Sequence, residues 1–431
     1  MKEDFLHYVW QYQYFLKDNL RTTAGEEIVV RTPGLYNRSD AGPDFSNARI
    51  LLGDTEWVGS VELHLLTSDW QRHRHQQDAK YNQVVLHVVW EEDESVQREE
   101  GTLMPTLELK GRVDLSLQAQ YQELLWSQEE IPCAAQVPRV DSIYKSAMME
   151  KTLLERLQLK ADLVQERLTQ TRQDWESTVY QTMAAGFGFK INQQGFSQLT
   201  QVLPLSLINR YRHVPKQLEA LVFGQAGLLV SLEEQVAYLQ ELEKEHQYLT
   251  QKHSLSAPLP QSAWNYLRLR PANFPAIRVG QWLAVLQAHH HLWADLVACD
   301  NLEDYFTYFR QSPPAYWQEH YAPGRTSAQL YQRIGDDSIQ GLLINVVAPL
   351  LVAYSRLQGN DGYQEKAVTL LERLVKEQNK ITRIYTGLGF PHTCAADSQA
   401  LLGLYQNYCA PKKCLHCSIG HRLLKQNLSP A

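Results

Sequence analysis

The sequence predicts a mixed α+β protein in which a region rich in strands precedes a long helical region. Short runs rich in β-branched and aromatic residues concentrate in the first 115 residues. From residue 141 onward, apolar residues recur at helical spacing, as in 148–171. A length of 431 residues suits two or three domains. We predict a domain at 1–115, a connector at 116–140 and a helical domain at 141–431.

The N-terminal elements follow the order helix, strand, strand, strand, helix, strand, with one further strand after them. The first helix shows aromatic and aliphatic residues near a 3.6-residue period. The fourth strand is rich in valine, which is typical of a strand buried on both faces. The expected helices are 2–18 and 69–80, and the expected strands are 27–31, 47–52, 56–66, 83–90 and 102–110.

For the remaining chain the sequence predicts helices separated by proline-containing breaks. After the helix at 148–171, the expected helices are 196–203, 215–223, 231–250, 262–268, 279–299, 327–333, 338–357, 363–378 and 397–408.

Charge and hydropathy exclude several classes of protein. A net charge of −7 argues against coating nucleic acid by bulk charge, although it leaves room for a local site. The longest apolar runs, such as 342–354, are short for a membrane span and contain a proline. The N-terminus carries two early acids and no apolar core of signal length. We therefore expect a cytoplasmic protein without a membrane partner.

Two carboxylates and a histidine form the first candidate site. Asp44 follows Pro43 just before a predicted strand, and Glu62 and His64 share one face of the next strand. Carboxylates on adjacent strands can hold a hard divalent cation such as Mg²⁺ or Mn²⁺. A third group beside them can orient or deprotonate a water for attack on phosphorus.

This arrangement resembles the PD-(D/E)XK nuclease superfamily, whose core has the same order of elements. The resemblance covers about 90 of the 431 residues. It implies that Asp44 and Glu62 are the two acids, and it places His64 where the superfamily has a lysine. Gln77 and Tyr81 match the Gln-x-x-x-Tyr motif of the RecB-like branch and would orient the site. Lys80 could supply the charge of the missing lysine, and the substrate would be DNA or RNA.

The same residues also have ordinary structural explanations. Asp44 can shape a turn, and Glu62 can pair with Arg49 across the strands. A rival metal site would use His64, His73, His75 and Asp78 to bind zinc. On a helix His73 and His75 would point about 200° apart, so they would need a loop conformation to share an ion.

Four of the six cysteines lie close to the C-terminus. Their spacing is Cys-x14-Cys-x4-Cys-x2-Cys, through Cys394, Cys409, Cys414 and Cys417. In a cytoplasmic chain such clustering favours metal over disulfides. Four sulfurs suit structural zinc or a 4Fe-4S cluster. Some RecB-like nucleases hold an iron–sulfur cluster with an isolated cysteine and a C-terminal trio, which these cysteines loosely resemble. The alternative is four ordinary thiols.

The whole chain also resembles a family of bacterial proteins known only as a domain of unknown function. The resemblance lies in residues 40–47, 57–70, 86–89 and 408–420, and it implies no activity. We therefore expect a divalent-metal-dependent nuclease. The alternative is a non-catalytic interaction protein on a decayed nuclease fold, with a structural metal site and protein partners bound through its helical domain.

Overall fold

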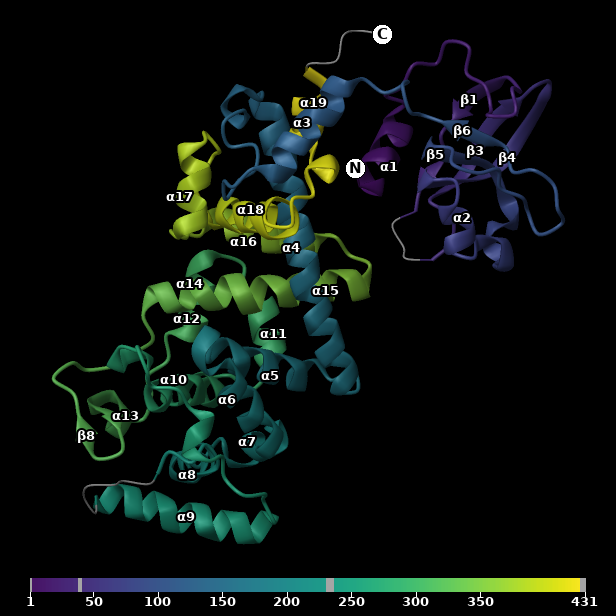
Figure 1. Cartoon of the computed structure of the whole chain (residues 1–431). Helices are drawn as coiled ribbons and strands as arrows, with labels where there is room; N and C mark the ends of the chain where they lie inside the picture. The colour runs from purple at the N-terminus through teal and green to yellow at the C-terminus, as the bar shows by residue number, and fades with distance from the viewer. Residues whose placement is uncertain (1, 38–40, 230–235, 427–431) are drawn as a thin grey trace. The chain divides into compact units, whose positions relative to one another are not determined.

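The computed structural model describes residues 2–37, 41–229 and 236–426. It confirms the mixed α+β class, with an N-terminal sheet followed by helices (Figure 1). The chain forms two compact units. The sheet unit comprises residues 1–149, 387–390 and 404–431, and the helical unit comprises residues 150–386 and 391–403.

The main sheet has six strands in the order β1-β3-β4-β5-β6, with the short β2 paired to β3. Strand β4 pairs antiparallel with β3 and parallel with β5, and β6 continues parallel to β5. Every strand expected from the sequence is present within a few residues. The strands are β1 Ile28–Thr32, β2 Leu35–Tyr36, β3 Phe45–Leu52, β4 Thr55–Leu66, β5 Val84–Glu91 and β6 Thr106–Glu108.

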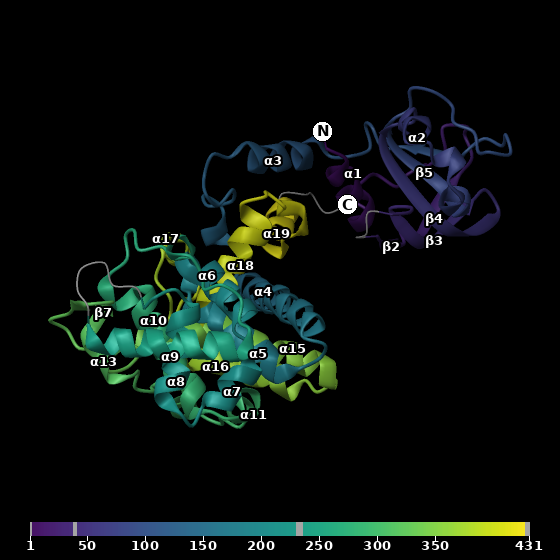
Figure 2. The ribbon, with the colours of Figure 1, turned by 90° about the horizontal axis from the view of Figure 1, so that it is seen from below.

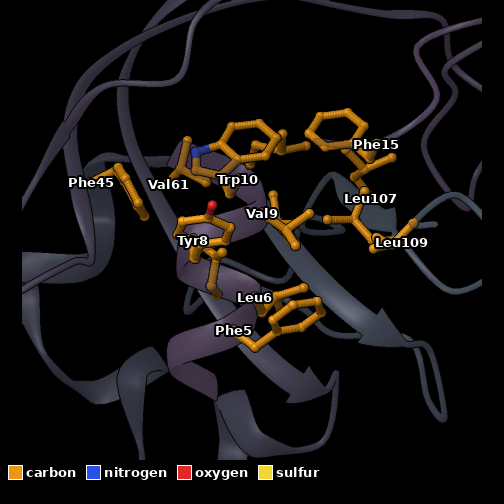
Figure 3. Packing of buried hydrophobic residues seen from close by; sticks show 14 of the residues in the cluster. Phe5, Leu6, Tyr8, Val9, Trp10, Phe15, Phe45, Val61, Leu107 and Leu109 are labelled. Carbon is orange, nitrogen blue, oxygen red and sulfur yellow. The ribbon is translucent and has the colours of Figure 1, made fainter. Parts of the chain in front are cut away.

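Helix α1 (Glu3–Tyr12) packs its apolar side against one face of this sheet. Two acids in its first turn, Glu3 and Asp4, interact favourably with the positive end of the helix dipole. Gln13 adopts φ 57° and ends the helix, which is therefore shorter than the predicted 2–18. Figure 3 shows apolar side chains of α1 gathered with Phe45, Val61, Leu107 and Leu109.

The predicted helix at 69–80 is wrong. Helix α2 covers only Asp69–Arg72, and two 3₁₀ turns follow it, η1 (His75–Gln77) and η2 (Ala79–Gln83). Between them Arg74 has φ 61°, a left-handed conformation that an α-helix cannot contain. These short turns make the crossover that a parallel β4–β5 pair requires.

The C-terminal segment completes the core of the sheet unit. It contains the turn η7 (Tyr405–Cys409), the 3₁₀ turn η8 (Cys414–His416) and helix α19 (Ser418–Gln426). Leu415 and Leu424 are buried in the same core as α1. Helix α19 lies beside α3 (Leu115–Trp126) (Figure 2). The structure thus groups residues 404–431 with the sheet, whereas the sequence boundaries had included them in the helical domain.

The helical unit agrees in part with the helices expected from sequence. The segment 262–268 contains only the turn η4 (Gln261–Ala263), and 327–333 is not helical, so both predictions are wrong. The expected helix 279–299 is interrupted at 289–291. Residues 231–235 of the expected helix 231–250 lie outside the described part of the chain.

The helices from α4 onward, with one hairpin among them, occupy these bounds: α4 Ser142–Gln170 (which begins in the sheet unit), α5 Trp175–Phe187, α6 Phe189–Val202, α7 Leu205–Tyr211, α8 Pro215–Gln225, α9 Ala237–His253, α10 Pro275–Ala288, α11 Leu292–Val297, α12 Leu302–Phe309, α13 Ala315–Glu319, β7 His320–Ala322, β8 Arg325–Thr326, α14 Asp336–Leu342, α15 Ala348–Gln358, α16 Gly362–Arg373, α17 Lys380–Gly387 and α18 Ala395–Leu404.

One helical stretch, Asp336–Gln358, is long and apolar enough to cross a membrane. It is the stretch in which α14 and α15 are joined through a π-helical turn. The most apolar part of this stretch is 72% buried inside the fold, as in the core helix of a soluble protein.

The shared core leads to a prediction about stability. Leu424→Ala should destabilise the sheet unit by about 2–5 kcal/mol, because it removes a fully buried side chain and leaves a cavity. Urea unfolding, followed by hydrogen exchange of amides in α1, measures the effect. Leu267→Ala is the matched control, since Leu267 is 79% exposed. Unchanged exchange in α1 would show that α19 does not support the sheet.

Candidate metal centre

Two adjacent strands bring Asp44, Glu62 and His64 together. The backbone N–H of Asp44 donates to Glu62 Oε2 at 3.0 Å, and the N–H of Leu63 donates to Asp44 Oδ2 at 2.9 Å. These reciprocal hydrogen bonds fix both carboxylates where β3 begins. His64 follows two residues after Glu62 on β4, and its Nε2 lies 3.7 Å from Glu62 Oε1. The three residues selected from the sequence therefore form one cluster.

Two histidines from the crossover complete this cluster. Nδ1 of His73 lies 3.1 Å from Nε2 of His64, and Nε2 of His75 lies 3.3 Å from Glu62 Oε1. One ring nitrogen from each of the three histidines lies within 4.8 Å of the other two. The left-handed Arg74 between His73 and His75 supplies the non-helical conformation that the zinc alternative required. We call Glu62, His64, His73 and His75 the imidazole–carboxylate centre.

Three of the separations between these atoms match those around a tetrahedral ion. Ligand atoms 2.0–2.1 Å from a tetrahedral zinc lie about 3.3 Å from one another. The three separations given above, 3.1, 3.3 and 3.7 Å, are close to that value. Nε2 of His75 is buried and, within the described residues, has no hydrogen-bond partner. Three imidazoles thus converge, and the Glu62 carboxylate lies within 3.7 Å of two of them, His64 and His75.

His87 on β5 orients the ring of His64 through a hydrogen bond to its other nitrogen, Nδ1. Its Nε2 lies 2.9 Å from Nδ1 of His64. When His64 donates its Nδ1–H to His87, its Nε2 keeps a lone pair directed toward Glu62 and His73. Metal-binding histidines are commonly fixed in this way by a hydrogen bond to the other ring nitrogen.

Burial sets the protonation of the centre. Burial, followed by the charge of Asp44, raises the pKa of Glu62 to about 9. Burial and then the neighbouring imidazoles lower the pKa of His64 to about 2. Burial also lowers the pKa of His87 to about 3. At neutral pH and without metal, His64 therefore carries a neutral imidazole and Glu62 a protonated carboxyl, and a cation would displace that proton.

His7 on α1 is a further member that the sequence analysis did not select. Its Nε2 lies 3.1 Å from Asp44 Oδ2. Burial lowers the pKa of His7, but the hydrogen bond and charge of Asp44 outweigh burial, and the net pKa is raised. No spacing rule connects position 7 to position 44, since the contact depends on how α1 docks on the sheet.

The nuclease resemblance also suggested Tyr81, Gln77 and Lys80 as site residues, and of these Tyr81 packs against the centre. Tyr81 stacks on the ring of His75 at a centroid distance of 3.8 Å and helps to orient it. Gln77 and Lys80 are exposed, and among the described residues neither side chain forms a hydrogen bond or ion pair with the centre. Asp78, part of the zinc alternative, instead caps η2 by accepting the N–H of Lys80 at 3.0 Å.

The C-terminal cysteines fall in both units. Cys409, Cys414 and Cys417 are buried in the sheet unit, whereas Cys394 belongs to the helical unit. There the backbone of Cys394 forms an isolated bridge with Val375.

Comparison with known families matches residues 3–380 to one described as "Protein of unknown function (DUF2851)". The chain belongs to this family. Searches of curated proteins and of solved structures find no match. The region that matches DUF2851 contains the whole imidazole–carboxylate centre, His7 and Asp44.

We predict that the protein binds one equivalent of Zn²⁺ at this centre. His73→Ala and His75→Ala should each weaken binding at least about 100-fold, since each removes a ligand, and His87→Ala should weaken it about 10–100-fold. Calorimetric titration at pH 7.5 measures the affinities. His290→Ala is the control, because His290 is an exposed histidine of the helical unit. Equal affinity in all variants would exclude this site.

A second prediction concerns pH. Because the folded-state pKa of Glu62 lies above its ordinary value of 4.5, its contribution to stability falls as pH rises toward about 9. His64 and His87 act in the opposite direction, but only below their ordinary value of 6.5. Between pH 7 and 8.5, metal-free wild type should therefore lose up to about 1.4 kcal/mol per pH unit relative to Glu62→Gln.

Urea unfolding in the presence of a chelator, at several pH values, gives the two slopes. Other groups, including His7, titrate in both proteins, so the difference between slopes isolates Glu62. If the free energy of unfolding changed equally with pH in wild type and Glu62→Gln, Glu62 would be ionised without metal.

Proposed function

We propose that the sheet unit is a metal-dependent phosphodiester hydrolase that acts on nucleic acid. The observation that carries this proposal is the convergence of Glu62, His64 and His75 beside Asp44, at atomic separations that suit one cation. A cation held there would polarise a phosphoryl oxygen and lower the pKa of a bound water.

The arrangement of strands supports this proposal. One acid precedes β3 and the other lies on β4, and the crossover to a parallel β5 follows. This is the order expected for a PD-(D/E)XK-like core. The donors, however, are mostly imidazoles, which suit zinc and related ions better than the Mg²⁺ or Mn²⁺ expected from two carboxylates.

His7 can take the role that a lysine has in the superfamily. Its raised pKa and its place beside Asp44 favour the imidazolium. A positive charge there would stabilise the charge that develops on the phosphoryl group. Arg72 and Arg74 are exposed on either side of His73 and could contact neighbouring phosphates.

A second candidate is a structural metal centre in a non-catalytic protein. The observation that favours it is His64 in the lysine position together with the exposed Lys80, whose ammonium forms no hydrogen bond or ion pair with the centre among the described residues. In that case the metal would link the crossover to β4 and stabilise the sheet, and the protein would catalyse no reaction there.

Cleavage assays decide between the two candidates. Protein shown to hold metal should cut single-stranded, duplex or branched DNA, or RNA, in the presence of Zn²⁺ or Mn²⁺. Asp44→Asn and His73→Ala should lower the rate by at least about 100-fold. His7→Gln should lower the rate while metal stays bound, and His290→Ala should match wild type. Metal-loaded protein that cuts none of these substrates would leave the structural centre as the explanation.

A further inference from the structure

A cavity in the helical unit lies where three helices begin. It has a volume of about 320 Å³. Its lining comes from the junction of α5 and α6 at 187–192, from residues within 273–278 at the start of α10, and from Asp337 and Ser338 in the first turn of α14. Figure 1 shows α6 and α10 beside α5, which contacts both. The imidazole–carboxylate centre shares none of these residues.

One buried cation, Arg278, lines this cavity. Arg278 is 6% exposed. Its Nη1 donates to Gln281 Oε1 at 3.0 Å, and its Nη2 donates to Ser338 Oγ at 2.8 Å and to Asn273 Oδ1. Its Nε is buried and, within the described residues, has no hydrogen-bond partner. Three of the five N–H bonds of the guanidinium therefore have acceptors, and all three acceptors are neutral.

The charge of this guanidinium has no acidic partner among the residues that the structure describes. Asp336, the acid that begins α14, pairs instead with Arg310 at 3.2 Å. Burial lowers the pKa of Arg278 to about 10, and no carboxylate opposes that shift. Arg278 therefore stays charged at neutral pH. A buried charge without a counter-charge is costly, and a bound anion would supply the one that is missing.

The ring of Phe189 orients the guanidinium without neutralising it. The guanidinium carbon of Arg278 lies 4.6 Å from the centroid of this ring, in a cation–π contact. Phe189 adopts φ 48°, a left-handed conformation that is unfavourable for a bulky residue. Such strain occurs preferentially where a ligand is held. The contact thus fixes the direction of a charge that remains uncompensated.

The rest of the lining determines which anion suits the cavity. Lys190 and Asp337 are exposed and carry opposite charges, so together they add no net charge. The first residues of α6 and α10 line the cavity, and the positive ends of these helix dipoles favour a negative charge there. One buried cation in an apolar setting suits a single negative charge on an apolar body better than a phosphate dianion. Most of the cavity surface is apolar, and its apolar side chains are Phe187, Phe189, Ile191, Phe196, Leu269 and Pro275.

We infer that this cavity binds a small organic carboxylate, with the carboxylate beside Arg278 and the apolar body against the phenylalanine rings. The hydroxyl of Ser338 accepts a hydrogen bond from Arg278 and can donate its own proton to the carboxylate. The cavity volume is within the range of small-molecule sites. The inference concerns the helical unit and does not depend on the hydrolase proposal.

Calorimetric titration of the full-length protein with 2-naphthoate tests the inference. This probe carries one carboxylate on an apolar body, and 2-naphthylmethanol is its neutral counterpart. A chelator keeps metal from the imidazole–carboxylate centre, where a carboxylate could also bind. Wild type should bind naphthoate at least about 10-fold more tightly than naphthylmethanol, because hydrogen bonds between charged groups are the stronger kind.

Variants assign this preference to the cavity. Arg278→Met should abolish the preference for naphthoate, and circular dichroism shows whether this variant folds. Arg210→Met is the matched control, because Arg210 is an exposed arginine of the same unit. Ile191 lines the cavity and is 44% exposed, so it tolerates a charge. Naphthoate should bind Ile191→Glu about 2–10-fold more weakly than Ile191→Lys, which gives an independent reading if Arg278→Met does not fold.

Several outcomes would overturn the inference. Equal binding of both probes by wild type would mean an apolar cavity that recognises no anion. Tighter binding of 2-naphthyl phosphate than of naphthoate would mean a phosphate site. No binding of any probe, or an unchanged preference in Arg278→Met, would leave Arg278 as a structural residue. His73→Ala should bind naphthoate as wild type does, so failure of the hydrolase proposal leaves this result unchanged.

Discussion

Burial of the Glu62 carboxyl among imidazoles is the constraint on which the chemistry of the sheet unit depends. Glu62 is 5% exposed, and Asp44 stands beside it. A second negative charge in that position is costly without a counter-charge, so the carboxyl holds its proton. Burial of the neutral carboxyl is tolerable because it accepts a hydrogen bond from the backbone N–H of Asp44. A bound dication would supply the missing counter-charge, so that the carboxyl could ionise, and would make the cluster rigid.

The donor set determines which ions suit the centre. Two carboxylates alone would favour a hard ion with several waters. Three imidazoles and one carboxylate favour a borderline ion with fewer open positions. The two acids that resemble the nuclease pattern therefore stand in a setting that differs from that pattern. The difference arises from the crossover, where His73 and His75 lie on either side of a left-handed residue.

The two ends of the chain share one core. Helix α1 and residues of η8 and α19 bury apolar side chains against the same sheet. The hydroxyl of Tyr8 lies 3.1 Å from Nδ1 of His421, which adds a polar contact between the ends. Loss of the C-terminal segment would therefore expose the surface that positions α1, and with it His7.

The sequence by itself determined the α+β class, the strands and the pairing of Asp44, Glu62 and His64. These features depend on local periodicity and on residues two apart on one strand, which a linear pattern records. It also named His73 and His75, but it could not bring them together, because the turn at Arg74 has no marker such as glycine. The place of His7 was decided by tertiary structure alone. His7 approaches Asp44 only when α1 docks on the sheet, and no spacing rule encodes that docking.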